Sequence, residues 1–480
     1  MSTNNPTQVQ NTLAEINRNS NSGKGIVFDP QTDELKTMNP AANAPPNTTM
    51  ITSIAKDGWA LNTPVVYAYE QEVTEFIENG NPLKRGAAFG WQDENVYHVH
   101  VDFPKTPFSG IPCIAIFAKV SKEEFISDKT TLANKLGIIN SSDNGCNKTI
   151  FYIFYFDGNT VQKAAFLVTD NSLTECCFQY VPQKSELFSR SKGLLETDVL
   201  EKKNVTVIGL GSFGSNVTIE LAKAGIGHFK LFDFDRIELS NISRHICGTN
   251  DLGRYKTHAI RDAILQKNPF ADVQTFEINI NEHEELLITE IKNTDIILCM
   301  TDENRSRSRI NALAIKYQKK AIYGRAVTRA EGGDVFRYIP EKTKPCFACL
   351  IGKGLFDFQK EEISTTKQAD RDLPAYTNAE DRDALVQAGL SSDILPICNL
   401  IVKLTLVELS KGLNCGLTSL EEDLVADYYL WANRRENNYK NFPKMEYKAN
   451  QLSILRWYGV RVDKDTDCPA CNEVTIQLGF

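Results

Sequence analysis

A glycine-rich turn between an expected strand and an expected helix is the first segment that could bind a ligand. Val205–Gly214 reads Val-Thr-Val-Ile-Gly-Leu-Gly-Ser-Phe-Gly, which places three glycines in the spacing G-x-G-x-x-G. Gly209 permits a tight turn, Gly211 lets the backbone approach a phosphate, and Gly214 lets the helix pack on the strand. The helix N-terminus offers N–H donors to an anion. The next expected strand ends in Asp233, where a carboxylate can hold ribose hydroxyls. This pattern alone would suit a nicotinamide dehydrogenase equally well.

Two C-x-x-C pairs could hold a metal ion. They are Cys346-Phe-Ala-Cys349 and Cys468-Pro-Ala-Cys471. Each pair places two thiolates on a tight turn, and two such pairs complete a tetrahedral, structural four-sulfur zinc site. A redox role is open to either pair, but two pairs in one chain favour zinc. Closing the site would hold the C-terminal segment against the nucleotide-binding domain.

The residues after the glycine-rich turn favour one nucleotide chemistry over the other. Asp233-Phe-Asp-Arg-Ile-Glu-Leu-Ser-Asn-Ile-Ser-Arg244 is followed by Gly253-Arg-Tyr-Lys256 and by the segment Asp295–Asp302, with Arg307 and Asn311 on the next expected helix. From about Leu187 to the C-terminus, this series resembles the ThiF/MoeB superfamily of ubiquitin-like-protein activating enzymes. The resemblance implies an α/β fold, a Rossmann-like ThiF-type adenylation domain with a mostly parallel sheet.

The resemblance also implies a reaction and a role for each motif residue. Such enzymes attack the α-phosphorus of ATP with the C-terminal carboxylate of a small protein, which yields an acyl-adenylate and pyrophosphate. Charge builds on the phosphates, so cations and Mg²⁺ must be placed around them. Asp233 would bind the ribose, and Asn241 and Arg244 would contact phosphates. Lys256 would neutralise the reacting phosphates, and Asp302 would help hold Mg²⁺.

Two further residues are assigned from weaker matches. Leu187-Phe-Ser-Arg190 resembles a degenerate form of the family's R-Y-x-R-Q segment, in which the first arginine is replaced by Leu187. Arg190 would then reach the ATP of the partner subunit in a homodimer. Cys398 is the nearest candidate for a thioester cysteine, because no cysteine lies between Leu350 and Ile397. Its alternative interpretation is a buried small hydrophobe on a helix.

Composition limits the class of protein. The 480 residues carry a formal net charge of −8, which argues against a general nucleic-acid binder. No apolar run approaches the roughly 20 residues that span a bilayer. The N-terminal residues lack a secretory signal pattern, so the twelve cysteines are expected to be reduced and the compartment to be the cytoplasm.

The chain is expected to have three parts. Residues 1–48 are polar and form a flexible tail, residues 49–182 form an α+β accessory domain, and residues 183–480 form the adenylation domain with its zinc site. The polar, acidic segment 355–390 is expected to be a functional or disordered loop. In the adenylation domain we expect strands at 204–209, 228–233, 272–278, 295–300 and 320–324, and helices at 213–224, 254–267, 304–318 and 394–409.

The sequence of the accessory domain indicates a fold and a function less specifically than that of the adenylation domain does. Its pattern predicts a helix at 67–77, strands at 96–103, 112–120, 149–156 and 160–169, and a hairpin turn at Asp157-Gly158. His98 and His100 share one strand face and could bind a metal. They resemble a piece of the JAB/MPN-type zinc motif, but the following residues depart from it. The segment also resembles a ubiquitin-conjugating fold that lacks the catalytic cysteine in its expected place. The simplest interpretation is a non-catalytic docking domain with two strand histidines.

These observations predict ATP-dependent adenylation of a ubiquitin-like β-grasp protein that ends in Gly. If Cys398 serves, thioester formation and transfer to a ubiquitin-conjugating-like partner would follow. The alternatives are a sulfur-carrier-protein adenylyltransferase of cofactor biosynthesis, a scaffold that binds a ubiquitin-like protein without ATP, and an NAD-dependent oxidoreductase. The expected cofactors are ATP, Mg²⁺ and structural Zn²⁺, and neither nucleic acid nor a membrane is an expected partner.

Overall fold

The computed structural model describes a defined part of the chain and divides it into two compact units. The main division falls between Gln179 and Tyr180, and each unit is described by itself below. The described residues are 25–29, 34–38, 63–91, 95–102, 110–138, 148–157, 160–169, 172–181, 187–352, 389–436, 439–441 and 453–472.

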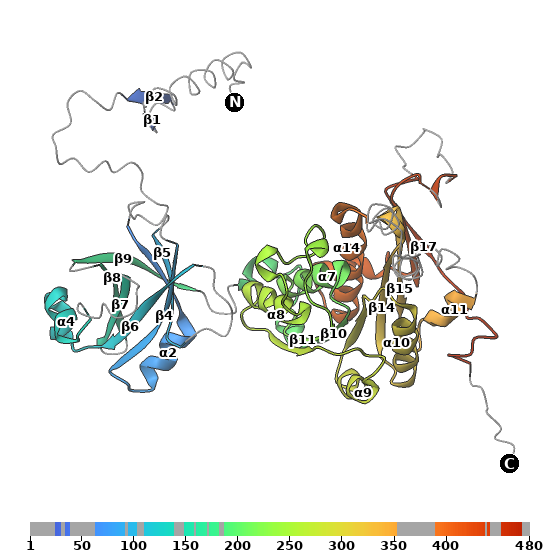
Figure 1. Cartoon of the computed structure of the whole chain (residues 1–480), viewed down its shortest axis with the longest axis horizontal. Coiled ribbons are helices and arrows are strands. Elements are labelled where there is room, and N and C mark those ends of the chain that lie inside the picture. The colour runs from blue at the N-terminus through green and yellow to red at the C-terminus, as the bar shows by residue number, and fades with distance from the viewer. Residues whose placement is uncertain are drawn as a thin grey trace, which may run out of the picture. The chain divides into compact units, whose positions relative to one another are not determined.

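Seven strands of the N-terminal unit close into a barrel (Figure 1). Their order is β3-β5-β4-β6-β7-β8-β9, with parallel pairing between β3 and β5 and between β6 and β7. The two strands predicted on either side of Asp157-Gly158 pair antiparallel as β7 and β8 up to Asp157 and Thr160, as a hairpin requires, and Gly158 itself lies outside the described residues. The bounds are β3 Val65–Tyr69, β4 Leu83–Trp91, β5 Val96–His100, β6 Ile111–Lys119, β7 Lys148–Asp157, β8 Thr160–Thr169 and β9 Ser172–Val181.

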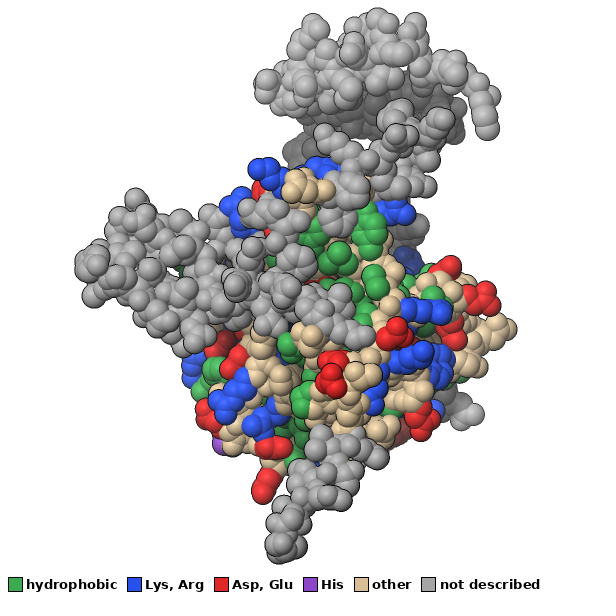
Figure 2. All heavy atoms as spheres, turned by 90° about the vertical axis from the view of Figure 1, so that its right-hand side faces the viewer, with side chains coloured by type: hydrophobic (Ala, Val, Ile, Leu, Met, Phe, Trp, Pro, Cys, Tyr) green, Lys and Arg blue, Asp and Glu red, His purple; other side chains and the backbone are tan. Residues whose placement is uncertain are grey.

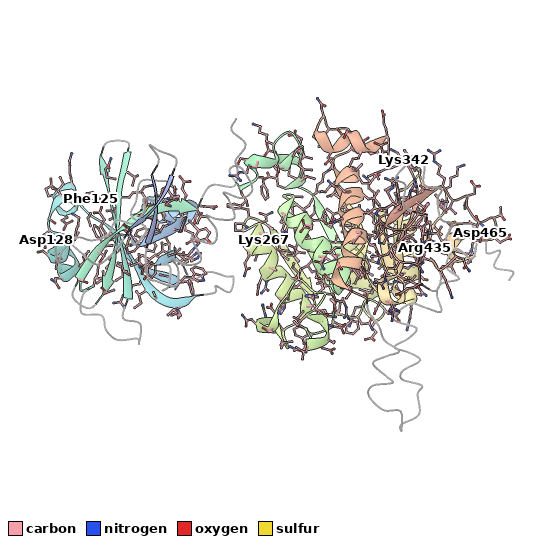
Figure 3. The ribbon with its side chains drawn as sticks, turned by 90° about the horizontal axis from the view of Figure 1, so that it is seen from above. Phe125, Asp128, Lys267, Lys342, Arg435 and Asp465 are labelled. Carbon is pink, nitrogen blue, oxygen red and sulfur yellow. The ribbon has the colours of Figure 1, made fainter. Side chains whose placement is uncertain are left out.

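Three short helices accompany these strands, and one of them corrects an expectation. The helix predicted at 67–77 begins only at Glu70, as α2 (Glu70–Glu78), because Val65–Tyr69 pairs with β5 as a strand. Likewise, the strand predicted at 96–103 ends at His100. Helices α3 (Lys122–Ile126) and α4 (Lys129–Lys135) follow β6. Asp128, which Figure 3 labels, precedes α4. Its carboxylate caps the helix by accepting a hydrogen bond from the Thr131 N–H at 2.8 Å.

Part of the predicted flexible tail has regular backbone structure. Strands β1 (Gly25–Asp29) and β2 (Glu34–Met38) pair antiparallel, with Gly25 opposite Met38. These ten residues begin regular structure earlier in the chain than expected, and an isolated two-stranded hairpin is at best marginally stable, so the flexible tail stays a prediction. The rest of the predicted tail lies outside the described residues.

An eight-stranded sheet forms the centre of the second unit. The order is β12-β11-β10-β13-β14-β15-β16-β17, with the first five strands parallel and the remaining pairings antiparallel. All five predicted strands are found, and the predicted α/β fold with a mostly parallel sheet is confirmed. The bounds are β10 Asn204–Ile208, β11 His228–Phe232, β12 Asp272–Phe276, β13 Ile296–Cys299, β14 Lys320–Ala326, β15 Gly332–Tyr338, β16 Tyr428–Ala432 and β17 Arg456–Val460.

Helices cover both faces of this sheet (Figure 1). Helices α7 (Ser212–Lys223), α8 (Lys256–Lys267) and α14 (Ser391–Leu409) pack on one face, against the side chains of Val205 and Val207. Helices α9 (Glu284–Lys292), α10 (Asn304–Lys316) and α11 (Phe347–Gly352) pack on the other, where Ile208 points. A strand buried on both faces explains the continuous apolar runs of the sequence.

Two expectations concern the chain as a whole. Within the part that the structure describes, none of the helices combines the length and apolar character needed to span a bilayer. The segment predicted at 355–390 to be a loop falls almost entirely outside the described residues.

Basic and acidic side chains are interspersed over the face of the molecule shown in Figure 2.

Candidate nucleotide-binding site and cysteine cluster

A cavity of about 240 Å³ opens at the carboxyl ends of the parallel strands. It lies where β10 has β11 on one side and β13 on the other, the point at which the strand order reverses. Open α/β sheets bind their ligands in this crevice, because the loops leaving adjacent strands there diverge to opposite faces. The structure brings seven of the predicted residues together in the cavity lining: Gly209, Gly211, Asp233, Asn241, Arg244, Lys256 and Asp302.

The three glycines of the turn differ in what a side chain would meet at their positions. Gly209 has a φ of +88°, and a Cβ atom there would lie 2.8 Å from the Met300 carbonyl oxygen. A Cβ atom at Gly214 would overlap the Gly209 carbonyl, so this glycine allows α7 to pack closely on β10. At Gly211, by contrast, a Cβ atom would meet no atom within 4 Å. Packing within the protein therefore does not explain Gly211, and its predicted contact with a phosphate stays a prediction.

The carboxylate of Asp233 lies at the end of β11 and is tied to the turn. Its Oδ2 atom accepts a hydrogen bond from the Leu210 N–H at 2.6 Å, and its Oδ1 atom accepts one from the Asp235 N–H at 2.8 Å. Burial raises the pKa of Asp233, although Lys256 and the two backbone donors act in the opposite direction. The position fits the predicted contact with a ribose.

Lys256 is the first residue of α8, and its ammonium group is buried at the cavity wall. Its Nζ atom lies 2.8 Å from Asp235 Oδ2. Burial lowers the pKa of Lys256, but the carboxylates of Asp233, Asp235 and Asp302 outweigh that effect, so the pKa lies above its ordinary value. The site therefore holds a permanent positive charge beside three carboxylates.

Arg244 and Asn241 come from the loop between β11 and α8. The Arg244 guanidinium donates from Nη1 to the Ser240 carbonyl at 3.0 Å, and burial lowers its pKa. A partly desolvated guanidinium can gain strongly from an anionic partner. The Asn241 side-chain carbonyl accepts a hydrogen bond from the Glu238 N–H at 3.0 Å, which holds the short helical turn Leu239–Asn241.

Several residues of the cavity wall were not assigned from the sequence. Asp235 is the ion-pair partner of Lys256, and His245 is buried beside Arg244. Arg325 lines the cavity from β14, and its guanidinium pairs with the buried carboxylate of Asp334 on β15. An arginine in an otherwise apolar strand could have marked Arg325 as a candidate site residue, but the predicted strand ended at residue 324.

The two weaker assignments lie outside the cavity lining. Cys398 is only 1% exposed on α14, and its Sγ atom lies 4.0 Å from the Phe213 carbonyl oxygen. Burial raises the pKa of Cys398 to about 12, which is opposite to the low pKa that a reactive thiol needs. Arg190 is exposed on the short helical turn Ser189–Ser191. Both roles stay predictions, and the burial of Cys398 gives the thioester role no support.

The four cysteines of the two C-x-x-C pairs meet at one point. Their sulfur atoms all lie within 4.8 Å of one another, at 3.8 Å for Cys346–Cys349, 3.6 Å for Cys346–Cys468 and 3.4 Å for Cys349–Cys471. A tetrahedral zinc ion with Zn–S bonds of about 2.3 Å separates its sulfur ligands by about 3.8 Å. The cluster therefore has the donor set and the dimensions for zinc.

A side chain of α10 supports this cluster. The Asn311 Nδ2 atom donates to Cys346 Sγ at 3.6 Å, and its Oδ1 atom accepts from the Phe347 N–H at 2.9 Å. The second knuckle lies beside Asp465, which Figure 3 labels at the C-terminal end of the described chain. Cys346 directly precedes α11 and Cys349 lies within it, so the cluster joins the start of α11 to the C-terminal segment, as the spacing predicted.

The two histidines of the N-terminal unit stay without an assigned role. His98 stacks on Tyr67 with a ring-centroid distance of 5.2 Å, and burial and His100 lower its pKa to about 4. Among the described residues, the four cysteines form the only group of three or more ligand side chains close enough to hold a metal ion. The docking role and both resemblances of this unit stay predictions.

Comparison with known proteins agrees with the geometry of the second unit. Residues 185–453 match the sequence model of the ThiF family. Over 155 residues the chain is 31% identical to the molybdopterin-synthase adenylyltransferase of Escherichia coli (strain K12), a match that covers 32% of this chain and 60% of that protein. Over 160 residues it is 28% identical to ubiquitin-like modifier-activating enzyme 5 of Caenorhabditis briggsae, covering 32% of this chain and 37% of that protein. The chain thus spans between about two fifths and three fifths of these relatives.

Solved structures align with part of the chain. The crystal structure of E. coli MccB with AMPCPP and selenomethionine MccA aligns with a TM-score of 0.43 at 18% identity, covering 60% of this chain and 75% of that chain. The structure of E. coli MccB with ATP aligns with a TM-score of 0.41 at 18% identity, covering 57% of this chain and 68% of that chain.

Proposed function

Because the chain belongs to the ThiF family, we propose that it is an ATP-dependent adenylyltransferase that activates the C-terminal carboxylate of a small ubiquitin-like protein. The observation that carries the proposal is the convergence of Asp233, Asn241, Arg244, Lys256 and Asp302 on one cavity beside a glycine-rich turn. Asp233, Asn241 and Arg244 lie in the connection between β11 and α8, and Lys256 is the first residue of α8. Asp302 comes from a separate loop, after β13, so the fold is needed to bring it to the other four.

The arrangement supports nucleotidyl transfer. The substrate carboxylate oxygen forms a bond to the α-phosphorus of ATP, and the bond from that phosphorus to the β-phosphate oxygen breaks, releasing pyrophosphate. Negative charge moves onto the departing phosphate, so fixed cations stabilise the transition state. Arg244 and Lys256 supply two such cations in the cavity, and the N-terminus of α7 adds backbone N–H donors.

Magnesium is part of the proposal. Carboxylate oxygens are the ligands that Mg²⁺ prefers, and Asp302 presents one at the cavity wall on the loop after β13. Bound there, the ion would neutralise phosphate charge and help to orient the nucleotide. Asp302 is exposed to solvent, which suits an ion that arrives with its nucleotide.

Pyrophosphate exchange tests the proposal directly. Purified protein is incubated with ATP, Mg²⁺ and labelled pyrophosphate, with and without candidate β-grasp proteins that end in Gly. We expect label to enter ATP only when the correct small protein is present, because the acyl-adenylate must form before it can be reversed. The same protein with its terminal Gly removed is the control. Binding of a candidate without nucleotide, and without exchange, would favour a scaffold, and tight binding of NADH would favour an oxidoreductase.

A sulfur-carrier protein is the second candidate substrate. The similarity to a molybdopterin-synthase adenylyltransferase and the burial of Cys398 both favour it, since such an activation needs no thioester on that cysteine. The two candidates differ in the fate of the adenylate. A reducible protein adduct that disappears in Cys398→Ala would favour the ubiquitin-like route, whereas direct conversion to a thiocarboxylate would favour sulfur transfer.

Four further assignments belong to the same proposal. Zinc in the four-cysteine cluster has a structural role, because four sulfur ligands leave no open coordination position. The enzyme acts in the cytoplasm as a homodimer, with Arg190 reaching the partner's nucleotide. The N-terminal unit serves as a docking domain for the small protein or for a ubiquitin-conjugating-like partner. Sedimentation analysis tests whether the protein is a dimer. Pyrophosphate exchange by Arg190→Ala, compared with the exposed control Lys192→Ala, tests the contribution of Arg190 to the reaction.

A further inference from the structure

Beyond these assignments, we infer that His245 is a positioning residue that fastens the phosphate-binding Arg244 to the glycine-rich turn. This inference rests on the proposed function and adds a residue to the same site. His245 lines the cavity and is 9% exposed. Its ring makes hydrogen bonds to backbone atoms on two sides, so its contribution to nucleotide binding is indirect.

The hydrogen bonds define the protonation of the ring. His245 Nδ1 accepts a hydrogen bond from the Cys247 N–H at 3.1 Å, and a backbone N–H can only donate. The proton of the neutral ring therefore lies on Nε2, which donates to the Leu210 carbonyl at 2.8 Å. Both ring nitrogens have a complementary partner only when His245 is neutral and in this tautomer.

Leu210 is held on both sides by residues of the site. It lies between Gly209 and Gly211, in the part of the turn that has the least conformational restraint of its own. Its N–H donates to Asp233, and its carbonyl accepts from His245. The imidazole thus completes a clamp on the peptide groups that form the phosphate-binding turn.

The backbone of Arg244 is fixed to the same structure. Its carbonyl oxygen accepts hydrogen bonds from Ser212 Oγ at 3.2 Å and from Asn216 Nδ2 at 3.2 Å, both on the first turns of α7. With the bond from His245 to Leu210, three side chains join residues 244–245 to the glycine-rich turn and its helix. The place where the Arg244 guanidinium enters the cavity therefore depends on these bonds.

The charges around His245 favour its neutral form. Burial lowers the pKa of His245, and the cations of Lys256 and Arg244 act in the same direction, whereas the Leu210 carbonyl and Asp251 oppose it. A protonated ring would lose the bond from the Cys247 N–H and add a third cation beside Arg244 and Lys256. A neutral amide can replace a neutral imidazole here, which makes glutamine the conservative substitution.

The test uses two probes that differ only in their phosphates. Binding of AMPCPP with Mg²⁺ and of adenosine is measured by calorimetry for wild type, His245→Phe and His245→Gln. In His245→Phe, AMPCPP affinity is expected to fall about tenfold, the equivalent of one to two lost hydrogen bonds, with adenosine affinity unchanged. His245→Gln keeps an N–H donor for Leu210 and should restore most of the loss. His258→Phe is the control, because His258 is a half-exposed histidine of α8 outside the cavity lining.

A second variant covers the case in which His245→Phe fails to fold. Asn216→Ala removes another bond to the Arg244 carbonyl from a residue outside the cavity lining. In this variant the affinity for AMPCPP should fall about threefold and the affinity for adenosine should stay unchanged. Equal losses for both probes, or no loss for either, would overturn the positioning role. If wild type itself binds neither probe, the proposed function fails together with this inference.

Discussion

The nucleotide cavity and the four-cysteine cluster are both built in the second unit, yet they differ in almost every physical property. The cavity is open and holds charges of both signs, from the buried ammonium of Lys256 to the exposed carboxylate of Asp302. The cluster is compact, with Cys346, Cys349 and Cys468 buried. A site that binds and releases a charged substrate has to keep polar groups accessible, whereas a structural metal site closes around its ion.

The two sites are also held together by different forces. The cavity residues are placed by the parallel sheet, which brings the ends of successive strands to one edge. The cluster joins two segments that lie far apart in the chain, and metal–sulfur bonds would be its main constraint. Substitutions in the cavity should therefore change activity with little change in stability, and substitutions in the cluster should do the reverse.

The largest effect on activity is expected for Lys256→Ala. Pyrophosphate exchange should fall by about 10²–10³-fold, since one fixed cation on the reacting phosphates is lost. The melting temperature should change little, because the partner carboxylate of Asp235 is half exposed and can be solvated. Lys267→Ala removes an exposed lysine at the other end of α8 (Figure 3) and should leave exchange unchanged. Full exchange in Lys256→Ala would contradict the role assigned to this residue.

The largest effect on stability is expected when the cluster is broken. In Cys468→Ser/Cys471→Ser, bound zinc should fall from about one ion per chain to nearly none, because two of four thiolate ligands are removed. The melting temperature should decrease by more than about 5 °C. Metal analysis and thermal denaturation measure both quantities, with Cys415→Ser as the control outside the cluster. An unchanged metal content would show that the cluster is not a zinc site.

Substitutions at two glycines of the turn should separate an effect on stability from an effect on AMPCPP binding. Gly209→Ala forces a side chain into a positive-φ position against the Met300 carbonyl and should lower the unfolding free energy by about 1–3 kcal/mol. Gly211→Ala meets no atom within 4 Å, so stability should change by less than about 0.5 kcal/mol while AMPCPP affinity falls. Denaturant unfolding measures the stability of the two variants, and calorimetry measures their affinity for AMPCPP. Equal affinity for AMPCPP in Gly211→Ala and wild type would place the phosphates elsewhere.

The raised pKa of Asp233 predicts a dependence of nucleoside binding on pH. A raised carboxyl pKa means that the folded protein binds this proton more tightly than the unfolded chain does, so the carboxylate form costs stability above that pKa and the cost is relieved as pH falls through it. Ribose binding uses the carboxylate form. Adenosine affinity should therefore fall by up to about tenfold per pH unit below the pKa. The decline should be absent in Asp233→Asn, and a decline that persists there would assign the proton to another group.

The smallest effect on adenylation is expected for Cys398→Ala. The thiol is buried in the core between α14 and α7, so its removal should cost about 1 kcal/mol of stability and leave pyrophosphate exchange unchanged. A reducible adduct with the small protein would require this thiol to become exposed. Loss of such an adduct in Cys398→Ala, but not in the control Cys247→Ala, would show that α14 moves during the reaction.

Local sequence was sufficient for the parts of the molecule that depend on short spacings. Every strand from Asn204 to Cys299 and the helices α7, α8 and α10 were predicted, because each strand is a largely apolar run and these helices alternate with the strands. Helix α9 (Glu284–Lys292) was not predicted. The four cysteines, Gly209, Gly211 and Asp233 were predicted from short motifs. Asn241, Arg244, Lys256 and Asp302 were assigned through the resemblance to the ThiF/MoeB superfamily. The N-terminal barrel was predicted less well, since Leu83–Trp91 contains glycines and charges that hide the strand, and Val65–Tyr69 runs directly into a helix.

Sequence alone determined which residues could do the chemistry, because residue type and short spacing set what a side chain can bind. Only the tertiary structure decided which of them face the cavity. Cys398 is buried because α14 packs against α7. Asp235 faces Lys256 because the two ends of the connection between β11 and α8 pair through a bridge between Arg236 and Tyr255. His245 became part of the site through hydrogen bonds to Leu210 and Cys247. Such contacts depend on how elements pack, and packing is set by many distant residues at once, so no local pattern could reveal them.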